Sequence, residues 1–366
     1  MLKPRSAPFR HGVAVVLLSV VAACAEPPSQ PAPTQAPSSG PSTTVTPDDS
    51  GTAAGSTTPP PASVATIAPR DLEAAVSPLT GLTVTGLADR PALVVKIDNH
   101  DRARPQFGLN AADVVYEQIV EGGLTRFAAV FHSRSATPVG PVRSVRTSDF
   151  PLLSNLGRPL FANSGGNENV LSLLADVDVV DVSSNSAGQA YYRFDGRFAP
   201  HNLLTGTDDL WAAGAERGAT GRPPQLFEFG DTTEAADAIT TVGVTIEYGT
   251  TVVTYVWDAD VAGWAREQDG TPHVDADGGP VAPTNLVVQF VSYGRSAADG
   301  RSPEAELVGS GEAWIFAQGR RVVAQWERAT ERDVTTFVDE AGDPVPLTPG
   351  TTWVALARVG QVSVNG

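Results

Sequence analysis

Short apolar runs separated by glycine, proline and aspartate turns dominate the chain from about residue 71 onward. The run 92–98 (ALVVKID) is apolar almost throughout, which is typical of a strand buried on both faces. Segments 112–120 and 125–133 are rich in β-branched and aromatic residues and are separated by 121–123 (EGG). This spacing predicts a β-hairpin with a glycine turn.

Helical spacing appears twice in the first half of this body. Segment 167–175 places three apolar side chains on one face and begins at Asn167, a good helix cap. Segment 208–217 is the second predicted helix, and Gly218 lies beyond its end. The apolar run 177–182 between them predicts a strand, so this half mixes strands with helices.

Beyond residue 222 the helical signals fade and strand patterns follow one another. The predicted strands are 244–248, 251–257, 286–292, 313–317, 321–325 and 352–357. Five of the six tryptophans lie here, which favours core or cross-strand packing, with a tryptophan-lined glycan groove as the alternative. The pattern predicts an α+β fold, with a mixed α/β sheet domain over 71–222 followed by a β-rich, mainly antiparallel domain over 223–366.

The first 23 residues have the pattern of a secretory signal. Basic residues precede the apolar run 12–23, which at about 12 residues is too short for a bilayer span of roughly 20. The run ends in 21–24 (VAAC), which resembles the lipobox of bacterial lipoproteins. We therefore expect a signal peptide over 1–23 and acyl chains such as palmitate on Cys24. The alternative is an ordinary signal peptide followed by an incidental cysteine.

Residues 24–70 have the composition of a stalk. Proline, serine, threonine, alanine and glycine dominate, and the segment contains no aromatic residue. Such a composition cannot bury enough apolar surface to fold, and as a coil it reaches roughly 40 Å. The chain is thus expected to stand on the outer face of the bacterial cytoplasmic membrane, held by lipid.

Composition excludes several classes of function. A formal charge of -16 argues against a nucleic-acid partner, because an acidic surface repels polyanions. One cysteine in 366 residues excludes an internal disulfide and a thiolate metal cluster. Glycine-rich nucleotide loops and the H-E-x-x-H motif are absent, so we expect neither a cofactor nor a metal.

A local reversal of charge stands out against this acidic background. The stretch 122–148 contains no aspartate or glutamate but carries Arg126, Arg143 and Arg146. Because the arginine fork suits carboxylate and phosphate, these residues are candidates for an anion-binding site. The alternative is internal ion pairing, for which the nearby acidic residues are Glu117, Glu121 and Glu168.

Four further residues are candidates for a polar pocket beside these arginines. His201 lies in 200–202 (PHN) and would serve as a general base, an anion donor or a structural hydrogen-bonding group. Glu121 is the other candidate base. Asn202 and Asn99 would orient neighbouring loops in either case.

A series of ordered motifs runs through both halves of the body. They are 77–82 (SPLTGL), 97–99 (IDN), 104–106 (RPQ), 112–117 (ADVVYE), 121–127 (EGGLTRF), 140–144 (GPVRS), 200–203 (PHNL), 264–266 (WAR), 270–275 (GTPHVD), 285–289 (NLVVQ) and 349–353 (PGTTW). Together they resemble the DUF3048 family of YerB-like bacterial lipoproteins. The resemblance covers about 77–362 and implies an envelope lipoprotein with an α+β amino-terminal domain, a β-rich carboxy-terminal domain and an association with cell-wall synthesis.

The sequence favours a non-enzymatic function. We expect a binding or scaffold protein whose partners are the membrane, through the lipid anchor, and a cell-wall polymer or wall-synthesis protein. The alternative is a hydrolase or transferase on an anionic wall substrate, with arginine clamps and His201 or Glu121 as base. A purely structural spacer is the third hypothesis.

Overall fold

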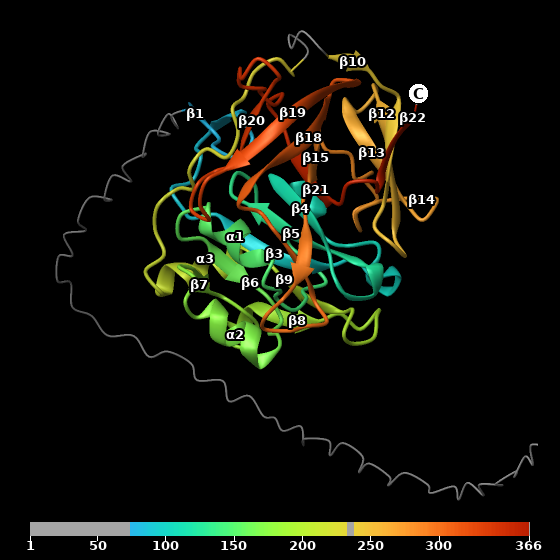
Figure 1. Ribbon diagram of the computed structural model, residues 1–366. Coiled ribbons are helices and arrows are strands. Elements are labelled where there is room, and N and C mark those ends of the chain that lie inside the picture. The colour runs from blue at the N-terminus through green and yellow to red at the C-terminus, as the bar shows by residue number, and fades with distance from the viewer. Residues whose placement is uncertain (1–73, 233–237, 366) are drawn as a thin grey trace, which may run out of the picture. The chain divides into compact units, whose positions relative to one another are not determined.

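A computed structural model describes residues 74–232 and 238–365 of the chain (Figure 1). The predicted signal peptide, Cys24 and nearly all of the stalk lie outside the described residues. Within the described part, no helix is both long and apolar enough to cross a membrane.

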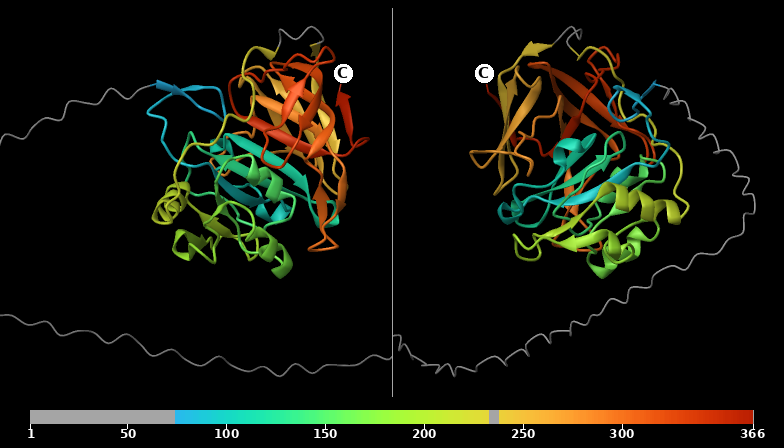
Figure 2. Two further views of the ribbon diagram at one scale, coloured as in Figure 1. Left: turned by 60° about the vertical axis from the view of Figure 1, so that its left-hand side comes forward. Right: turned by 180° about the vertical axis from the view of Figure 1, so that it is seen from behind.

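One large mixed sheet of eleven strands runs through the body (Figures 1 and 2). Its path is β10 (Ile239–Thr240), β19 (Arg320–Arg328), β18 (Gly309–Ala317), β15 (Asn285–Phe290), β21 (Thr352–Ala357), β4 (Val114–Ile119), β5 (Thr125–Phe131), β3 (Leu93–Asp98), β6 (Leu160–Ala162) and β7 (Val180–Asp181), with β20 (Thr336–Val338) also paired to β19. Strands β3, β6 and β7 are mutually parallel, and so are β4, β21 and β15.

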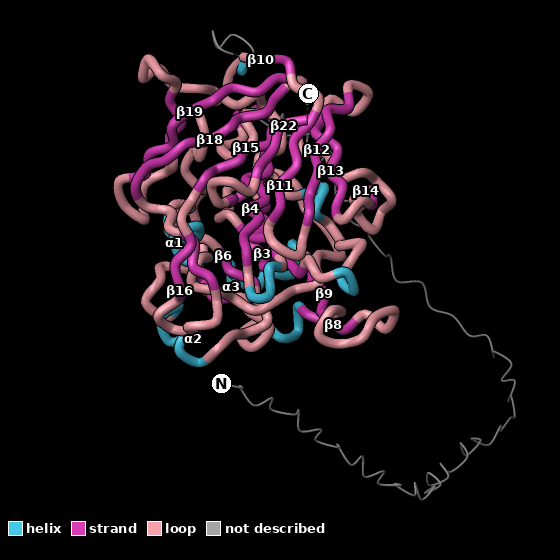
Figure 3. Tube along the Cα trace, turned by 45° about the vertical axis from the view of Figure 1, so that its right-hand side comes forward, coloured by secondary structure: helices cyan, strands magenta, loops and turns pink. Residues whose placement is uncertain are grey.

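The remaining strands form a smaller sheet, labelled in Figure 3, and three two-stranded ribbons. The five-stranded sheet is β14 (Thr271–Pro272), β13 (Gly263–Gln268), β12 (Val252–Asp258), β11 (Gly243–Glu247) and β22 (Val362–Asn365); the ribbons are β1 (Ala74–Val76) with β2 (Thr83–Thr85), β16 (Tyr293–Arg295) with β17 (Pro303–Ala305), and β8 (Tyr191–Arg193) with β9 (Leu203–Thr205). The helices are α1 (Asp149–Ser154), α2 (Glu168–Leu174) and α3 (Thr207–Glu216), with 3-10 turns η1 (Asp101–Ala103), η2 (Leu109–Ala111), η3 (Glu121–Gly123) and η4 (Gly188–Ala190).

The large sheet crosses the boundary that the sequence suggests near residue 222. Strand β21 pairs with β4 in parallel register, Thr352 opposite Val114, so strands from the two ends of the body are neighbours. The described residues all belong to one compact unit. The α+β description holds in outline, with many strands and few helices, whereas the division into two domains stays a prediction.

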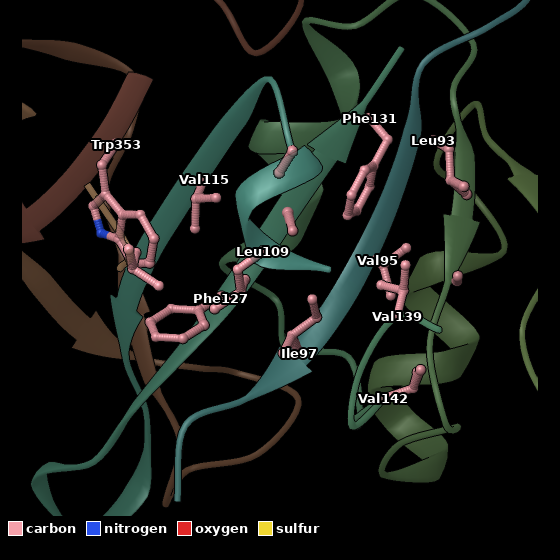
Figure 4. Packing of buried hydrophobic residues seen from close by; sticks show 14 of the residues in the cluster. Leu93, Val95, Ile97, Leu109, Val115, Phe127, Phe131, Val139, Val142 and Trp353 are labelled. Carbon is pink, nitrogen blue, oxygen red and sulfur yellow. The ribbon is translucent and has the colours of Figure 1, made fainter. Parts of the chain in front are cut away.

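Because side chains point alternately to the two faces of a strand, the central strands of the large sheet face a hydrophobic core on each side. Leu93, Val95 and Ile97 of β3 pack on one side with Phe127 of β5 and Trp353 of β21 (Figure 4). The smaller sheet contributes to this first core, where the ring of Trp264 lies 5.4 Å from that of Phe316. The intervening residues of β3 and β5 face a second core against α1 and α2. Burial on both faces explains the continuous apolar run of β3.

Most predicted elements are confirmed, with shifted ends. β4 and β5 form the predicted antiparallel hairpin, and its turn needs glycine because Gly122 and Gly123 both have positive φ. Helix α2 begins after Asn167, whose side chain accepts a hydrogen bond from the Asn169 amide. The strand predicted over 177–182 is shorter, since β7 spans two residues.

Candidate functional site

A cluster of charged side chains lies where β3 ends and β5 begins. Asp98 of β3 is opposite Arg126 of β5, which is opposite Gln118 of β4, so the three lie in a row across the sheet. They occupy the face opposite to Ile97 and Phe127, because neighbouring residues of a strand point to opposite faces. Lys96, two residues before Asp98 in β3, lies on the same face.

The segment 141–149 lies beside the end of β3, where Val142 forms an antiparallel bridge with Ile97, and its later residues contact this row of side chains. It is fixed to β3 by main-chain bonds from the Asp98 amide to the Pro141 carbonyl (2.9 Å) and from the Arg143 amide to the Lys96 carbonyl (2.8 Å). The site therefore adjoins the carboxyl ends of the parallel strands β3 and β6, where open α/β sheets commonly bind ligands. We call the group the arginine cluster; its charged members are Lys96, Asp98, Glu121, Arg126, Arg143, Arg146 and Asp149.

Three of the four cations in the arginine cluster have a carboxylate partner. Lys96 Nζ lies 2.6 Å from Asp149 Oδ1, with both side chains buried. Arg146 binds Glu121 through two bonds, Nε to Oε1 at 2.7 Å and Nη2 to Oε2 at 3.0 Å. The remaining pair is Arg143 Nε with Asp98 Oδ2 at 3.3 Å, too misaligned for a hydrogen bond. Internal ion pairing thus accounts for Arg143 and Arg146.

Arg126 is the exception. Its side chain donates one bond, from Nη1 to the Ser144 carbonyl at 3.3 Å, and among the described residues it has no carboxylate within 4.0 Å. Only 8% of the residue is exposed. Burial, together with the charges of Arg146 and Arg143, lowers the pKa of Arg126 to about 10, which leaves it protonated at neutral pH. The cluster therefore holds one unmatched positive charge.

Three other polar atoms at this end of the sheet make no hydrogen bond within the described structure. The Nε of Arg143 and the Nδ2 of Asn163, the residue that follows β6, are buried donors without an acceptor. Oε1 of Gln118 is a buried acceptor without a donor. A buried polar group without a hydrogen bond costs about 1–3 kcal/mol, so a bond from a ligand or from water to these atoms would stabilise the site.

Lys96, Asp98 and Asp149 were not among the residues that the sequence pointed to. Burial lowers the pKa of Lys96 to about 8, although Asp149 opposes the shift. The available signal was a lysine inside the apolar run of β3, in a chain with only one other lysine, Lys3. Asp149 gave no signal, since it pairs with a residue 53 positions away.

His201 and Asn202 lie at the rim of the arginine cluster. His201 Nδ1 is 2.7 Å from Asp98 Oδ2, and the His201 ring stacks on His100 with centroids 4.5 Å apart. Asn202 instead stabilises its own loop, since its Oδ1 accepts a bond from Arg193 at 2.8 Å. Of the predicted pocket, Glu121 is thus a member of the arginine cluster and His201 contacts the cluster through Asp98.

Asn99 lies in a different, fully buried network. Its Nδ2 donates to Thr125 Oγ1 at 2.7 Å and to Gln268 Oε1 at 2.9 Å. The centre of this network is the ion pair of Glu117 and Arg266, 2.8 Å apart, with both side chains 0% exposed. The structure thus separates Asn99 from the arginines and places it in a polar core that joins β5 to β13.

The tryptophans of the carboxy-terminal half are largely core residues. Trp264, Trp326 and Trp353 are 0–3% exposed. Trp353 Nε1 donates to Glu117 Oε2 at 3.0 Å, inside the buried network. The packing interpretation is confirmed for these three, and they do not line a glycan groove.

We predict that Glu121→Gln will lessen the loss of stability in acid. Burial alone would raise the pKa of Glu121, but hydrogen bonds from Arg146 and Ser302 outweigh it and lower the pKa to about 2. The stabilisation is present above about pH 4.5 and is lost as the pH falls toward 2, where the folded carboxylate takes up its proton. Urea unfolding at pH 5 and pH 3 should show a smaller difference for Glu121→Gln than for the wild type. The exposed Glu340→Gln should retain the wild-type difference, and equal differences for all three proteins would contradict the prediction.

Comparisons with known proteins give one consistent family. Residues 79–220 match the model described as "Protein of unknown function (DUF3048) N-terminal domain", and residues 244–354 match its C-terminal counterpart. The chain is 32% identical over 291 residues to "Putative lipoprotein YerB" of Bacillus subtilis (strain 168), covering 76% of this chain and 85% of that protein. The crystal structure of YerB protein from Bacillus subtilis superimposes with a TM-score of 0.71 at 27% identity, covering 80% of this chain and all of that one.

Proposed function

Since the chain belongs to the DUF3048 family, we propose that it is a lipid-anchored binding protein of the bacterial envelope that holds an anionic group of a cell-wall component. The anchor is supported by the signal pattern that ends at Cys24 and by the name of the Bacillus subtilis relative. The outer face of the membrane and the link to cell-wall synthesis are parts of the same proposal.

One observation carries the binding function: Arg126 is buried, charged and unmatched. A buried charge without a partner destabilises a fold, so its presence is explained best by a ligand that supplies the opposite charge. Arg143 and Asn163 add donors to the same end of the sheet. Each of the three carboxylates of the cluster has a closer cation, and Asp98 and Glu121 act on Arg126 only from beyond 4.0 Å, which leaves the positive charge of Arg126 for the ligand.

The candidate base Glu121 supports binding rather than catalysis. Both of its oxygens accept bonds from Arg146, and a pKa of about 2 makes it a weak base at neutral pH. The arrangement of His201 favours the enzymatic alternative, since its Nδ1 is oriented by Asp98, as in a histidine–aspartate pair. We place this alternative second because no hydroxyl of the described residues is hydrogen-bonded to His201.

Arg126→Met tests the binding function. Without ligand, the variant should be more stable than the wild type by about 1 kcal/mol, because it removes a buried charge that has no partner. Dimethyl phosphate, a monoanion, should raise the midpoint of thermal unfolding of the wild type. The midpoint of Arg126→Met should shift only as much as it does in an equal concentration of sodium chloride.

The exposed Arg295→Met serves as the matched control and should respond to dimethyl phosphate like the wild type. If Arg126 only stabilised the fold, the opposite results would be expected. In that case Arg126→Met would be destabilised and dimethyl phosphate would shift all three proteins alike, which would refute the proposal.

A further inference from the structure

Three aromatic side chains are exposed on one hairpin beside the arginine cluster. The hairpin consists of β8, β9 and the connecting residues 194–202, and we call it the aromatic hairpin. Tyr192 is 48% exposed, Phe194 37% and Phe198 92%. Single exposed apolar residues are common, but three aromatics on one short element suggest a contact surface.

Hydrogen bonds made by residues on either side of Phe198 hold the loop of the aromatic hairpin in place. Arg197, its neighbour, donates to the carbonyls of Ala103 and Pro105 at 2.6 Å each. Asn202 Nδ2 closes the loop by donating to the Arg197 carbonyl at 2.9 Å. The Phe198 ring therefore projects from a braced loop.

The same loop forms part of the rim of the arginine cluster. Arg143 Nη1 donates to the Pro200 carbonyl at 3.4 Å, two residues from Phe198 along the chain. His201, the next residue, contacts Asp98. The loop that carries Phe198 therefore borders the arginine cluster on the side of Arg143 and Asp98.

The charges of the cluster determine how much negative charge the ligand brings. Lys96 is matched by Asp149, Arg143 by Asp98 and Arg146 by Glu121, which leaves the single charge of Arg126. A monoanion neutralises the site. A dianion would leave an excess negative charge beside Asp98 and Glu121.

We infer that the ligand is an anionic glycan that places a singly charged group on Arg126 and a sugar ring on Phe198. Uronate and phosphodiester groups both present two oxygens that share one charge, which suits a guanidinium fork. The apolar face of a sugar ring packs its C–H groups against the electron-rich face of an aromatic ring. The inference rests on the proposed function and specifies its ligand class.

Calorimetric titration of the chain from residue 71 onward with three oligosaccharides tests the ligand class. The probes are an oligogalacturonate, a phosphodiester-linked glycan oligomer and a neutral maltooligosaccharide. We expect at least one charged probe to bind at least tenfold more tightly than the neutral one, and the tighter of the two identifies the natural source of the charge. Equal affinity for the neutral probe overturns the inference.

Phe198→Ser separates this inference from the anion site itself. The change should weaken charged-glycan binding about three- to tenfold, as expected for the loss of one aromatic contact, and leave dimethyl phosphate binding unchanged. Val359→Ser is the matched control, since Val359 is 85% exposed in the turn between β21 and β22.

The outcomes distinguish the two proposals. If Phe198→Ser binds the charged glycan as tightly as the wild type does, the glycan inference is wrong and the anion site stands. If the wild type binds neither dimethyl phosphate nor the charged glycans, the proposed function fails together with the inference.

Discussion

Arg266→Met should lower the free energy of unfolding by about 3–5 kcal/mol, because it leaves the buried Glu117 without its counter-charge. Nη2 of Arg266 lies 2.8 Å from Glu117 Oε1, and neither side chain is exposed. Burial alone would lower the pKa of Arg266, but the charge of Glu117, together with the interactions with Tyr255 and Tyr248, outweighs it and raises the pKa. Urea unfolding monitored by tryptophan fluorescence measures the effect.

A double variant shows whether the loss comes from the uncompensated charge. Combining Arg266→Met with Glu117→Gln removes both charges and should recover part of the stability lost in Arg266→Met. The exposed Arg295→Met should change stability by no more than about 0.5 kcal/mol. An Arg266→Met protein as stable as the wild type would show that the network contributes nothing to holding β4 against β13.

The network also explains why β13 was not predicted from the sequence. In this strand the inward positions are Trp264, Arg266 and Gln268, so polar residues stand where alternation requires apolar ones. Helix α1 was missed for a different reason, since its six residues include Pro151 and are too few to show a period. A local sequence pattern predicts a helix or strand only when the buried face of that element is apolar and long enough to show its period.

Long-range pairing limited the prediction of the site in the same way. The charge reversal around Arg126, Arg143 and Arg146 was visible because it is local in sequence. Their partners were only partly visible: Glu121 was proposed, whereas Asp98 was not, because its pairing with Arg143 depends on how the segment after β5 packs beside β3. Asn99 follows Asp98 directly, yet its side chain belongs to the buried polar network that joins β5 to β13.

The anchor is the feature with the largest expected effect on where the protein is found. Cys24→Ala should move nearly all of the protein from the membrane fraction into the medium, because the acyl chains supply the membrane affinity at about 0.8 kcal/mol per buried CH₂. Immunoblots of fractionated bacterial cells that express the full chain measure this distribution. Ser29→Ala, in the stalk, is the control and should leave the protein in the membrane fraction.

An uncleaved signal peptide would also retain the protein, so the mass of the mature chain must be measured with each variant. A second version of Cys24→Ala, in which residues 1–23 are replaced by a general secretory signal, removes this ambiguity. Membrane retention of this second version after cleavage would contradict the lipid anchor. Release would leave the body intact, since the arginine cluster and the aromatic hairpin lie between residues 96 and 205. The released protein should therefore bind dimethyl phosphate as the anchored one does, which would show that the lipid determines the location of the protein and is not needed for ligand binding.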